Sequence, residues 1–283
     1  MVKVVTDSTC DLSAEVLEEL GVVVVPLVVR IGNEEFLETD LSADEFWAKV
    51  EAARAQGLFP QTSQPSLGAF ESVFASLVGE GHEVACVTVT SKHSGTFNTA
   101  RAAAQGFGDA VMVFDSWSCS LGLGFMVMAA ARAAREGASL IEVLALLGEM
   151  RARTEILLVM DTIEYLKMGG RANAIIPILS RVMRFLQVKP IIKFVEGEIK
   201  LIGQARTFPA ALKRVEQLMK EFQPLEYLAV AHTRRPLDAQ AWAERLRESM
   251  GFQDQVPVAE IGPTLSCHAG PRLMAGLLVW KGE

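Results

Sequence analysis

Small hydroxyl side chains follow the predicted strands of this sequence, where they could bind an anion. Asp7-Ser8-Thr9 follows the β-branched residues 2–6, and Ser94-Gly95-Thr96 follows the apolar residues 84–90. A third group, Gln61-Thr62-Ser63-Gln64, precedes a predicted helix. In α/β sheets, ligands bind beyond the carboxyl ends of the strands. These donors are therefore expected to converge on one small anionic group.

Ser94-Gly95-Thr96 is the most informative of these groups. A helix that begins there offers free backbone amides and a partial positive charge, and Gly95 lets a ligand approach the backbone closely. A carboxylate would suit such a site. From spacing alone, however, a role of Ser94 as the cap of its helix is favoured. For Thr62 and Ser63, an ordinary turn before Pro65 is an equal alternative.

An enzymatic alternative makes Ser94 the nucleophile of a lipid esterase, with His93 or His268 as its base. The residues around Ser94 lack the first glycine of the G-x-S-x-G motif. Neighbouring residues of a helix point in different directions, so His93 need not face Ser94. A lone histidine such as His268 is more often structural than a ligand. The pattern is therefore a weak indication of a hydrolase.

Basic residues gather between Lys167 and Arg206. This segment holds eight lysine and arginine side chains and two glutamates, a local net charge of +6 in a chain whose total is -7. Such asymmetry indicates a surface that meets something anionic, whether a phosphate, an acidic partner or a membrane. A solvated face of alternating charges is the simpler alternative. An interaction module that uses this segment is thus a third hypothesis.

The composition excludes several classes of protein. The 283 residues are 50% hydrophobic, which excludes a disordered chain, and the acidic balance argues against binding of nucleic acid. Four widely separated cysteines indicate neither a zinc site nor a disulfide framework. A charge at Lys3 comes too early for a signal peptide, and the uncharged residues 116–131 are too few to span a bilayer. We expect a buried helix there, no metal or cofactor, and a cytoplasmic protein.

The predicted elements that would position these groups change in character along the chain. In the first half strands alternate with helices, one of which begins at the capping box Ser42-Ala43-Asp44-Glu45. This predicts a mostly parallel sheet with helices on both faces. The second half mixes helices with a hairpin at Glu196-Gly197. The expected fold class is therefore α/β with two domains, residues 1–155 and an α+β domain of residues 156–283. The expected strands are residues 2–6, 22–29, 84–90, 111–114, 155–160, 190–195, 198–202, 227–231 and 274–280.

Five motifs that occur in order along the chain resemble the DegV family. The resemblance spans essentially the whole chain, and five motifs in register are far more specific than any one. It implies a two-domain fatty-acid-binding protein with the lipid site between the domains, in bacteria the carrier subunit of fatty acid kinase. The motifs are Asp7-Ser8-Thr9-Cys10-Asp11-Leu12, Thr62-Ser63-Gln64-Pro65-Ser66, Ser94-Gly95-Thr96, Leu166-Lys167-Met168-Gly169-Gly170-Arg171 and His268-Ala269-Gly270-Pro271.

The resemblance implies a carrier that is not itself an enzyme. Such a protein holds a long-chain fatty acid, such as palmitate, stearate or oleate, with its tail buried and its carboxylate accessible. A separate ATP-dependent kinase subunit then phosphorylates the carboxylate to an acyl phosphate, and transient contact with a membrane is expected. The resemblance assigns carboxylate binding to Thr62, Ser94 and His268, with Ser63, Gly95 and Thr96 in support, and kinase contact to Arg171 and Lys167.

The sequence departs from the family pattern at Arg272. The family usually has a second glycine there, after the Gly270-Pro271 pair. We expect this difference to affect the backbone around Pro271 and the reach of His268, without changing the fold.

A buried acyl tail would supply most of the affinity that the resemblance implies. About 15 methylenes at roughly 0.8 kcal/mol each give a gross burial near 12 kcal/mol, about the size of nanomolar binding. Ordering and association costs reduce that figure. Neutral hydroxyl donors then only have to orient the carboxylate, so that a kinase can still reach it. Apolar residues that could line the tunnel include Phe125, Met126, Met128, Leu158, Met160, Ile191 and Ile192.

Overall fold

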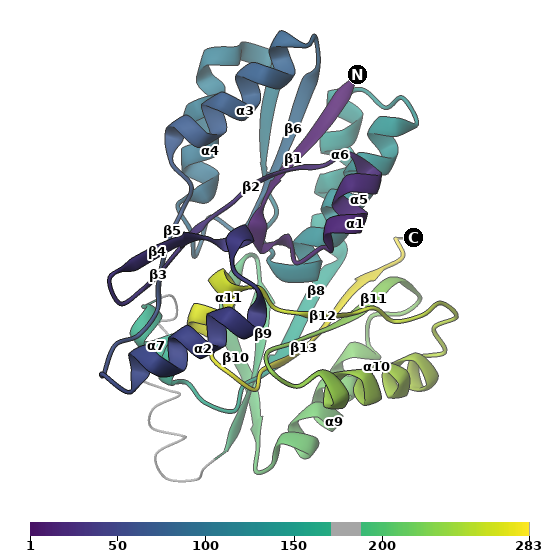
Figure 1. The fold of residues 1–283 in the computed structure, drawn as a ribbon. Coiled ribbons are helices and arrows are strands. Elements are labelled where there is room, and N and C mark those ends of the chain that lie inside the picture. Colours follow the sequence, from purple (N-terminus) through teal and green to yellow (C-terminus); the bar gives the residue numbers. More distant parts are fainter. Residues whose placement is uncertain (171–187, 283) are drawn as a thin grey trace.

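The computed structural model describes residues 1–170 and 188–282 and contains three β-sheets with helices around them (Figure 1). The first sheet is entirely parallel. Its strands lie in the order β2 (Val23–Val25), β1 (Val2–Asp7), β6 (Glu83–Thr88) and β7 (Val111–Asp115). One face is covered by α3 (Leu67–Gly79) and α4 (Thr96–Ala104), the other by α1 (Ala14–Leu20), α5 (Ser120–Arg135) and α6 (Leu140–Arg153). The prediction of a parallel sheet covered on both faces is confirmed.

The second sheet is formed by residues of the second half and is antiparallel except at one edge. Its order is β10 (Glu198–Ala205), β9 (Lys189–Val195), β8 (Thr154–Val159), β13 (Met274–Trp280), β11 (Leu225–His232) and β12 (Val258–Glu260). Helices α9 (Phe208–Met219) and α10 (Pro236–Met250) pack on one face, around the buried Trp242. The opposite face turns toward the first sheet and shares a hydrophobic core with α5.

A small third sheet joins the two halves of the chain. It consists of β4 (Glu34–Leu37), β3 (Val28–Ile31) and β5 (Gln61–Ser63). With α2 (Ala43–Arg54) it packs against two helices of the second half, α7 (Glu164–Gly169) and α11 (Pro263–Ala269) (Figure 1). The rings of Trp47 and Tyr165 meet edge-on at 6.3 Å in this core. A segment of the first half thus packs against the second half, and the division at residue 155 stays a prediction.

Local sequence signals explain where several elements begin and end. The capping box at Ser42 and Glu45 is present as predicted. The expected strand at residues 22–29 is instead two strands, β2 and β3, separated at Pro26, which has no N–H to donate to a ladder. The hairpin between β9 and β10 turns at Glu196 and Gly197, both with positive φ, as expected. Short 3-10 helices follow two strands and one helix: η1 (Ser8–Cys10) follows β1, η2 (Glu38–Asp40) follows β4, and η3 (Gln105–Ala110) follows α4.

The uncharged residues 116–131 contribute to a buried helix, as predicted. The first eight residues of α5 are buried. A Cβ added at Gly124 would lie 2.8 Å from the Cys10 carbonyl oxygen. A side chain at Gly124 would therefore displace the loop after β1. Over the residues that the structure describes, no helix is long and apolar enough to cross a membrane.

Candidate functional site

An apolar pocket lies against the second sheet, on the face that turns toward the first sheet. Residues on alternate positions of neighbouring strands line it, because successive side chains of a strand point to opposite faces. Their sequence neighbours Leu157, Ile191 and Leu278 face the core under α9 and α10 instead. Counted with the open solvent at its mouth, the pocket has an empty volume of about 1070 Å³. Its lining from this sheet is Ile156, Leu158, Met160, Ile192, Phe194, Ile199, Leu273, Ala275 and Leu277.

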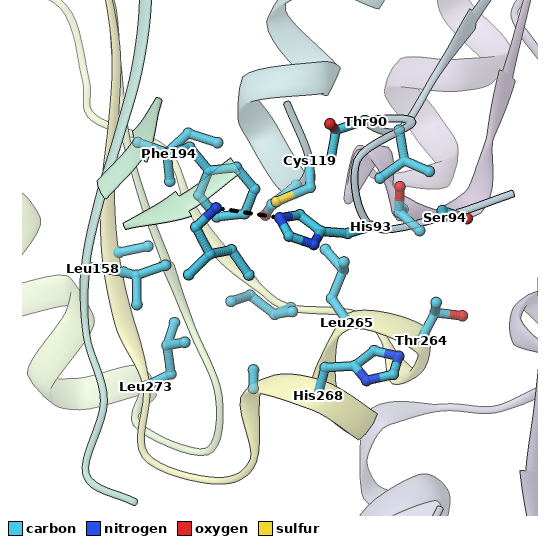
Figure 2. A pocket seen from close by; sticks show the side chains of 18 of the residues that line it. Thr90, His93, Ser94, Cys119, Leu158, Phe194, Thr264, Leu265, His268 and Leu273 are labelled. Carbon is cyan, nitrogen blue, oxygen red and sulfur yellow. Dashed lines mark hydrogen bonds between the residues drawn. The ribbon is translucent and has the colours of Figure 1, made fainter. Parts of the chain in front are cut away.

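The opposite wall of this apolar pocket carries the polar groups. It is formed by α11, by the loop between β6 and α4, by the start of α5 and by β5 (Figure 2). The hydroxyl and imidazole groups there come from Thr62, Ser63, Ser94, His93 and His268. Among the lining residues that the structure describes, none is a lysine or arginine. The pocket is therefore an apolar space with hydroxyl and imidazole groups on one side.

Thr62 and His268 meet at this polar wall although 206 residues separate them. Thr62 Oγ1 lies 2.9 Å from His268 Nε2, and either atom donates according to the tautomer of the imidazole. Thr62 is held on β5 by pairing with Val29, and His268 by the last turn of α11. From sequence spacing alone, an ordinary turn and an anion-binding site were equally favoured for Thr62. The structure instead places it in a strand, as part of the pocket lining.

Ser94 also lines the apolar pocket, but it is not the residue that caps α4. The N-cap is Gly95, and the Ser94 hydroxyl accepts a hydrogen bond from the Thr96 N–H at 3.3 Å. Ser94 Oγ also lies 2.8 Å from Thr96 Oγ1. Ser94 is half-buried and Thr96 is fully buried, so the Thr96 hydroxyl holds the Ser94 hydroxyl from the side that faces away from solvent.

The remaining residues expected at the site are placed less directly. Gly95 lies beside the Gln64 side chain in a neighbouring groove, where an added Cβ would come within 3.0 Å of Gln64. Ser63 lines both that groove and the apolar pocket.

The residues expected at the kinase contact and in the tunnel have mixed outcomes. Lys167 is exposed on α7, and Arg171 lies outside the described residues. Of the apolar residues expected in the tunnel, Leu158, Met160 and Ile192 line the pocket, and the described lining does not include Phe125, Met126, Met128 or Ile191.

The end of α7 packs against His268 at Gly169. A Cβ added to this residue would come within 2.2 Å of His268 Nδ1, so the end of α7 can pack against the imidazole only without a side chain. Gly170 then ends the helix with φ +68. The sequence showed the two glycines as a bend, but it did not show that they face His268.

Arg272 adopts the left-handed backbone conformation that a glycine would take more easily, with φ +65. Its N–H donates to the Thr233 carbonyl oxygen at 3.0 Å, and its guanidinium lies 3.1 Å from an Asp161 carboxylate oxygen. These contacts hold the loop in place. In this arrangement His268 Nε2 lies within hydrogen-bonding distance of Thr62 Oγ1.

The first half contains a cluster of three buried carboxyl groups, two of which contact the start of α11, and sequence reasoning did not find this cluster. Asp11 accepts the Gly262 N–H at 3.0 Å, and Glu38 accepts the Thr264 N–H at 2.9 Å and the Ser8 hydroxyl. Asp7 accepts hydrogen bonds from the loop residues Thr9 and Val89. Burial raises the pKa of Asp11 to about 7 and also raises the pKa of Asp7 and Glu38, although these hydrogen bonds oppose the shift. The helix that carries His268 is thus anchored at its N-terminus by two carboxyl groups of the first half.

The contacts of the histidines bear on the esterase alternative. The Ser94 hydroxyl lies beside Thr96 Oγ1, His268 Nε2 beside Thr62 Oγ1, and His93 Nε2 accepts the Ile199 N–H at 3.2 Å. None of these three contacts joins Ser94 to a histidine. Within the described part of the chain, no group of three acidic, histidine or cysteine side chains could hold a metal ion.

Comparison with known proteins identifies the family. The family model described as "Uncharacterised protein, DegV family" matches residues 1–281. The chain belongs to the DegV family. A DegV domain-containing protein of Halalkalibacterium halodurans is 34% identical over 276 residues, which cover 95% of this chain and 95% of that protein. The predicted family is therefore confirmed.

Solved structures of DegV proteins share the fold of this chain. A stearic-acid-binding protein from Eubacterium ventriosum has a TM-score of 0.87 at 28% identity, covering 99% of this chain and 98% of its own. A DegV family protein from Thermus thermophilus, described by its fatty acid binding, has a TM-score of 0.86 at 30% identity, covering 99% of both chains. The predicted fold class, α/β with a parallel first sheet and a sheet-rich C-terminal part, is confirmed.

Proposed function

We propose that this protein binds one long-chain fatty acid, such as palmitate, stearate or oleate, with its tail in the apolar pocket. The observation that carries the proposal is the apolar pocket itself, in which one face of a sheet supplies apolar side chains and the facing wall supplies Thr62, Ser94 and His268. An unbranched chain with one polar end matches this division. Two DegV relatives of the same fold bind stearic acid or fatty acid.

Hydroxyl and imidazole donors suit a carboxylate that has to react with a partner's substrate. The Thr62 hydroxyl and the His268 imidazole already lie 2.9 Å apart, and each can donate to a carboxylate oxygen placed between them and Ser94. A lysine or arginine would bind the carboxylate more tightly, and the described lining contains neither. The apolar tail then contributes most of the affinity, and the hydroxyls fix which end of the ligand faces outward.

We also infer that the carboxylate is presented to a separate ATP-dependent kinase subunit, with Lys167 and Arg171 in contact with that partner. The support is local: Lys167 is exposed on α7, and two residues later Gly169 lies against His268. A protein seated on this end of α7 would thus be next to the carboxylate. The inferred role is that of a carrier without its own catalytic residue, with Ser63, Gly95 and Thr96 supporting the carboxylate site.

Replacing Thr62 by valine is expected to weaken stearate binding about tenfold, because one hydrogen bond to a charged group is lost. Binding of stearyl alcohol should change less, since the alcohol carries no charge. Titration calorimetry on the delipidated protein measures both. Thr39→Val, exposed on η2 and outside the lining of the apolar pocket, is the matched control. Equal effects of Thr62→Val on the acid and the alcohol would contradict a role in carboxylate binding.

Replacing Lys167 by alanine is expected to slow acyl phosphate formation by a fatty acid kinase subunit severalfold, because an exposed contact for an anionic partner is removed. Stearate affinity should stay at the wild-type value. The two quantities are measured by radiolabelled phosphate transfer and by calorimetry, with Lys213→Ala on α9 as a control far from α7. A parallel loss of lipid binding would show that Lys167 acts on the pocket and not on the partner.

A further inference from the structure

The hairpin of β9 and β10 reaches across the apolar pocket to the loop that carries Ser94. Its residues Phe194 and Ile199 form one wall, and Thr90 and His93 belong to the wall that faces them. Two hydrogen bonds join the walls. The Thr90 hydroxyl donates to the Gly197 carbonyl oxygen at 3.1 Å. The Ile199 N–H donates to His93 Nε2 at 3.2 Å, the contact drawn as a dashed line in Figure 2.

The tip of the hairpin fits closely against this loop. Gly197 has φ +80, and an added Cβ would come within 2.4 Å of Thr90 Oγ1 and 3.2 Å of the Trp117 Cα. The His93 ring packs edge-on against Phe194, with ring centroids 6.2 Å apart. His93 therefore contacts both strands of the hairpin, through its Nε2 on β10 and through its ring on β9.

The hairpin is the part of the second sheet that can separate most easily from the first half. β10 is an edge strand, and its residues are alternately exposed and half-buried. Moving the hairpin tip breaks no backbone hydrogen bonds between the interior strands of the sheet. The contact of the tip with residues 90–94 is therefore what opposes that movement. The acceptor at Nε2 is essential to this contact, because the Ile199 N–H needs a lone pair.

We propose that His93 is a positioning residue that holds the β9–β10 hairpin against residues 90–94 and so sets how fast a fatty acid enters and leaves the pocket. This inference rests on the proposed fatty-acid-binding function. When the hairpin moves away, Phe194 and Ile199 leave the pocket wall. Weakening the contact raises the open population in both the empty and the loaded protein. Association and dissociation then become faster together.

The test measures both rate constants by stopped-flow fluorescence with a fluorescent long-chain fatty acid. His93→Phe keeps a flat ring beside Phe194 but has no acceptor, and it is expected to raise both rate constants about fivefold, the effect of one net hydrogen bond. His93→Gln keeps an acceptor and should restore rates close to wild type. His82→Phe, beside Glu80 in the first half, is the matched control and should change neither rate.

Unchanged rate constants in His93→Phe would overturn the inference. Faster dissociation with unchanged association would also overturn it, because that pattern means a lost ligand contact and not an opened wall. Hydrogen exchange at the Ile199 amide separates the inference from the proposed function. Without any lipid, this amide should exchange faster in His93→Phe than in wild type, and equal exchange would count against the contact. A wild-type protein that takes up no fatty acid would contradict the proposed function alone.

Discussion

An Ala275→Phe variant is expected to lose stearate binding and to keep decanoate binding. Ala275 is 3% exposed and faces the apolar pocket from β13, midway between Leu273 and Leu277. It pairs with Leu158 of β8, which lines the same pocket. A phenylalanine ring would fill the space that part of the tail needs. Displacing four or five methylenes costs roughly 3–4 kcal/mol, several hundredfold in Kd.

The dependence of binding affinity on acyl chain length distinguishes a blocked tail from a general loss of binding in Ala275→Phe. Calorimetry with a series of saturated acids should show affinity that stops rising with chain length in Ala275→Phe and continues to rise in wild type. Ala275→Val is the intermediate variant, and it keeps the test valid should the larger ring strain the core. An unchanged affinity for stearate, or the same loss for every acid, would show that the tail does not pass Ala275.

A Glu38→Ala variant is expected to lower the free energy of unfolding by about 3 kcal/mol, because a buried backbone donor of α11 loses its acceptor. Glu38 is 5% exposed and accepts the Thr264 N–H at 2.9 Å. The same helix carries His268, so stearate binding should weaken as well. Glu38→Gln keeps an acceptor for Thr264 and should recover most of both losses. Chemical denaturation and calorimetry measure the two effects.

The control for Glu38 is Glu35→Ala on the preceding strand β4, where the carboxylate is exposed beside Arg30 and should contribute little. A Glu38→Ala protein as stable as Glu35→Ala would contradict the anchoring role. The pH dependence gives a second readout. Because burial raises the pKa of Glu38 and Asp11, the folded state keeps protons that the unfolded state releases. Wild-type stability should therefore fall as pH rises from about 4 toward 7, and Glu38→Gln should flatten that slope.

Much of the fold could be predicted from the sequence because its strands and caps carry local signals. The β-branched runs at β1 and β6, the capping box at Ser42 and the turn at Glu196-Gly197 each depend on neighbouring residues. The third sheet could not be predicted in this way. β5 is only three residues long and polar, and it is a strand because it pairs with β3, which lies far from it in the sequence.

The candidate site was predictable where motifs mark it and not where it depends on tertiary contacts. Thr62, Ser94 and His268 were indicated by motifs, and all three line one pocket. Asp11 and Glu38 were missed because isolated acidic residues usually indicate a solvated surface, and only the fold buries them at α11. The role of His93 was also invisible, since its partner is a backbone N–H 106 residues away. Arg272 has a positive φ, the backbone conformation that glycine adopts most easily, and sequence patterns alone do not reveal such a conformation at an arginine.

The most direct test of fatty acid binding is to identify what the purified protein holds. Native mass spectrometry gives the mass of the complex, and denaturation followed by lipid extraction and mass spectrometry identifies the released molecule. We expect one free, unesterified long-chain fatty acid per chain in wild type, and much less of it in Ala275→Phe. A wild-type protein that is empty and takes up no added fatty acid would contradict the account, as would an acyl group covalently attached to Ser94.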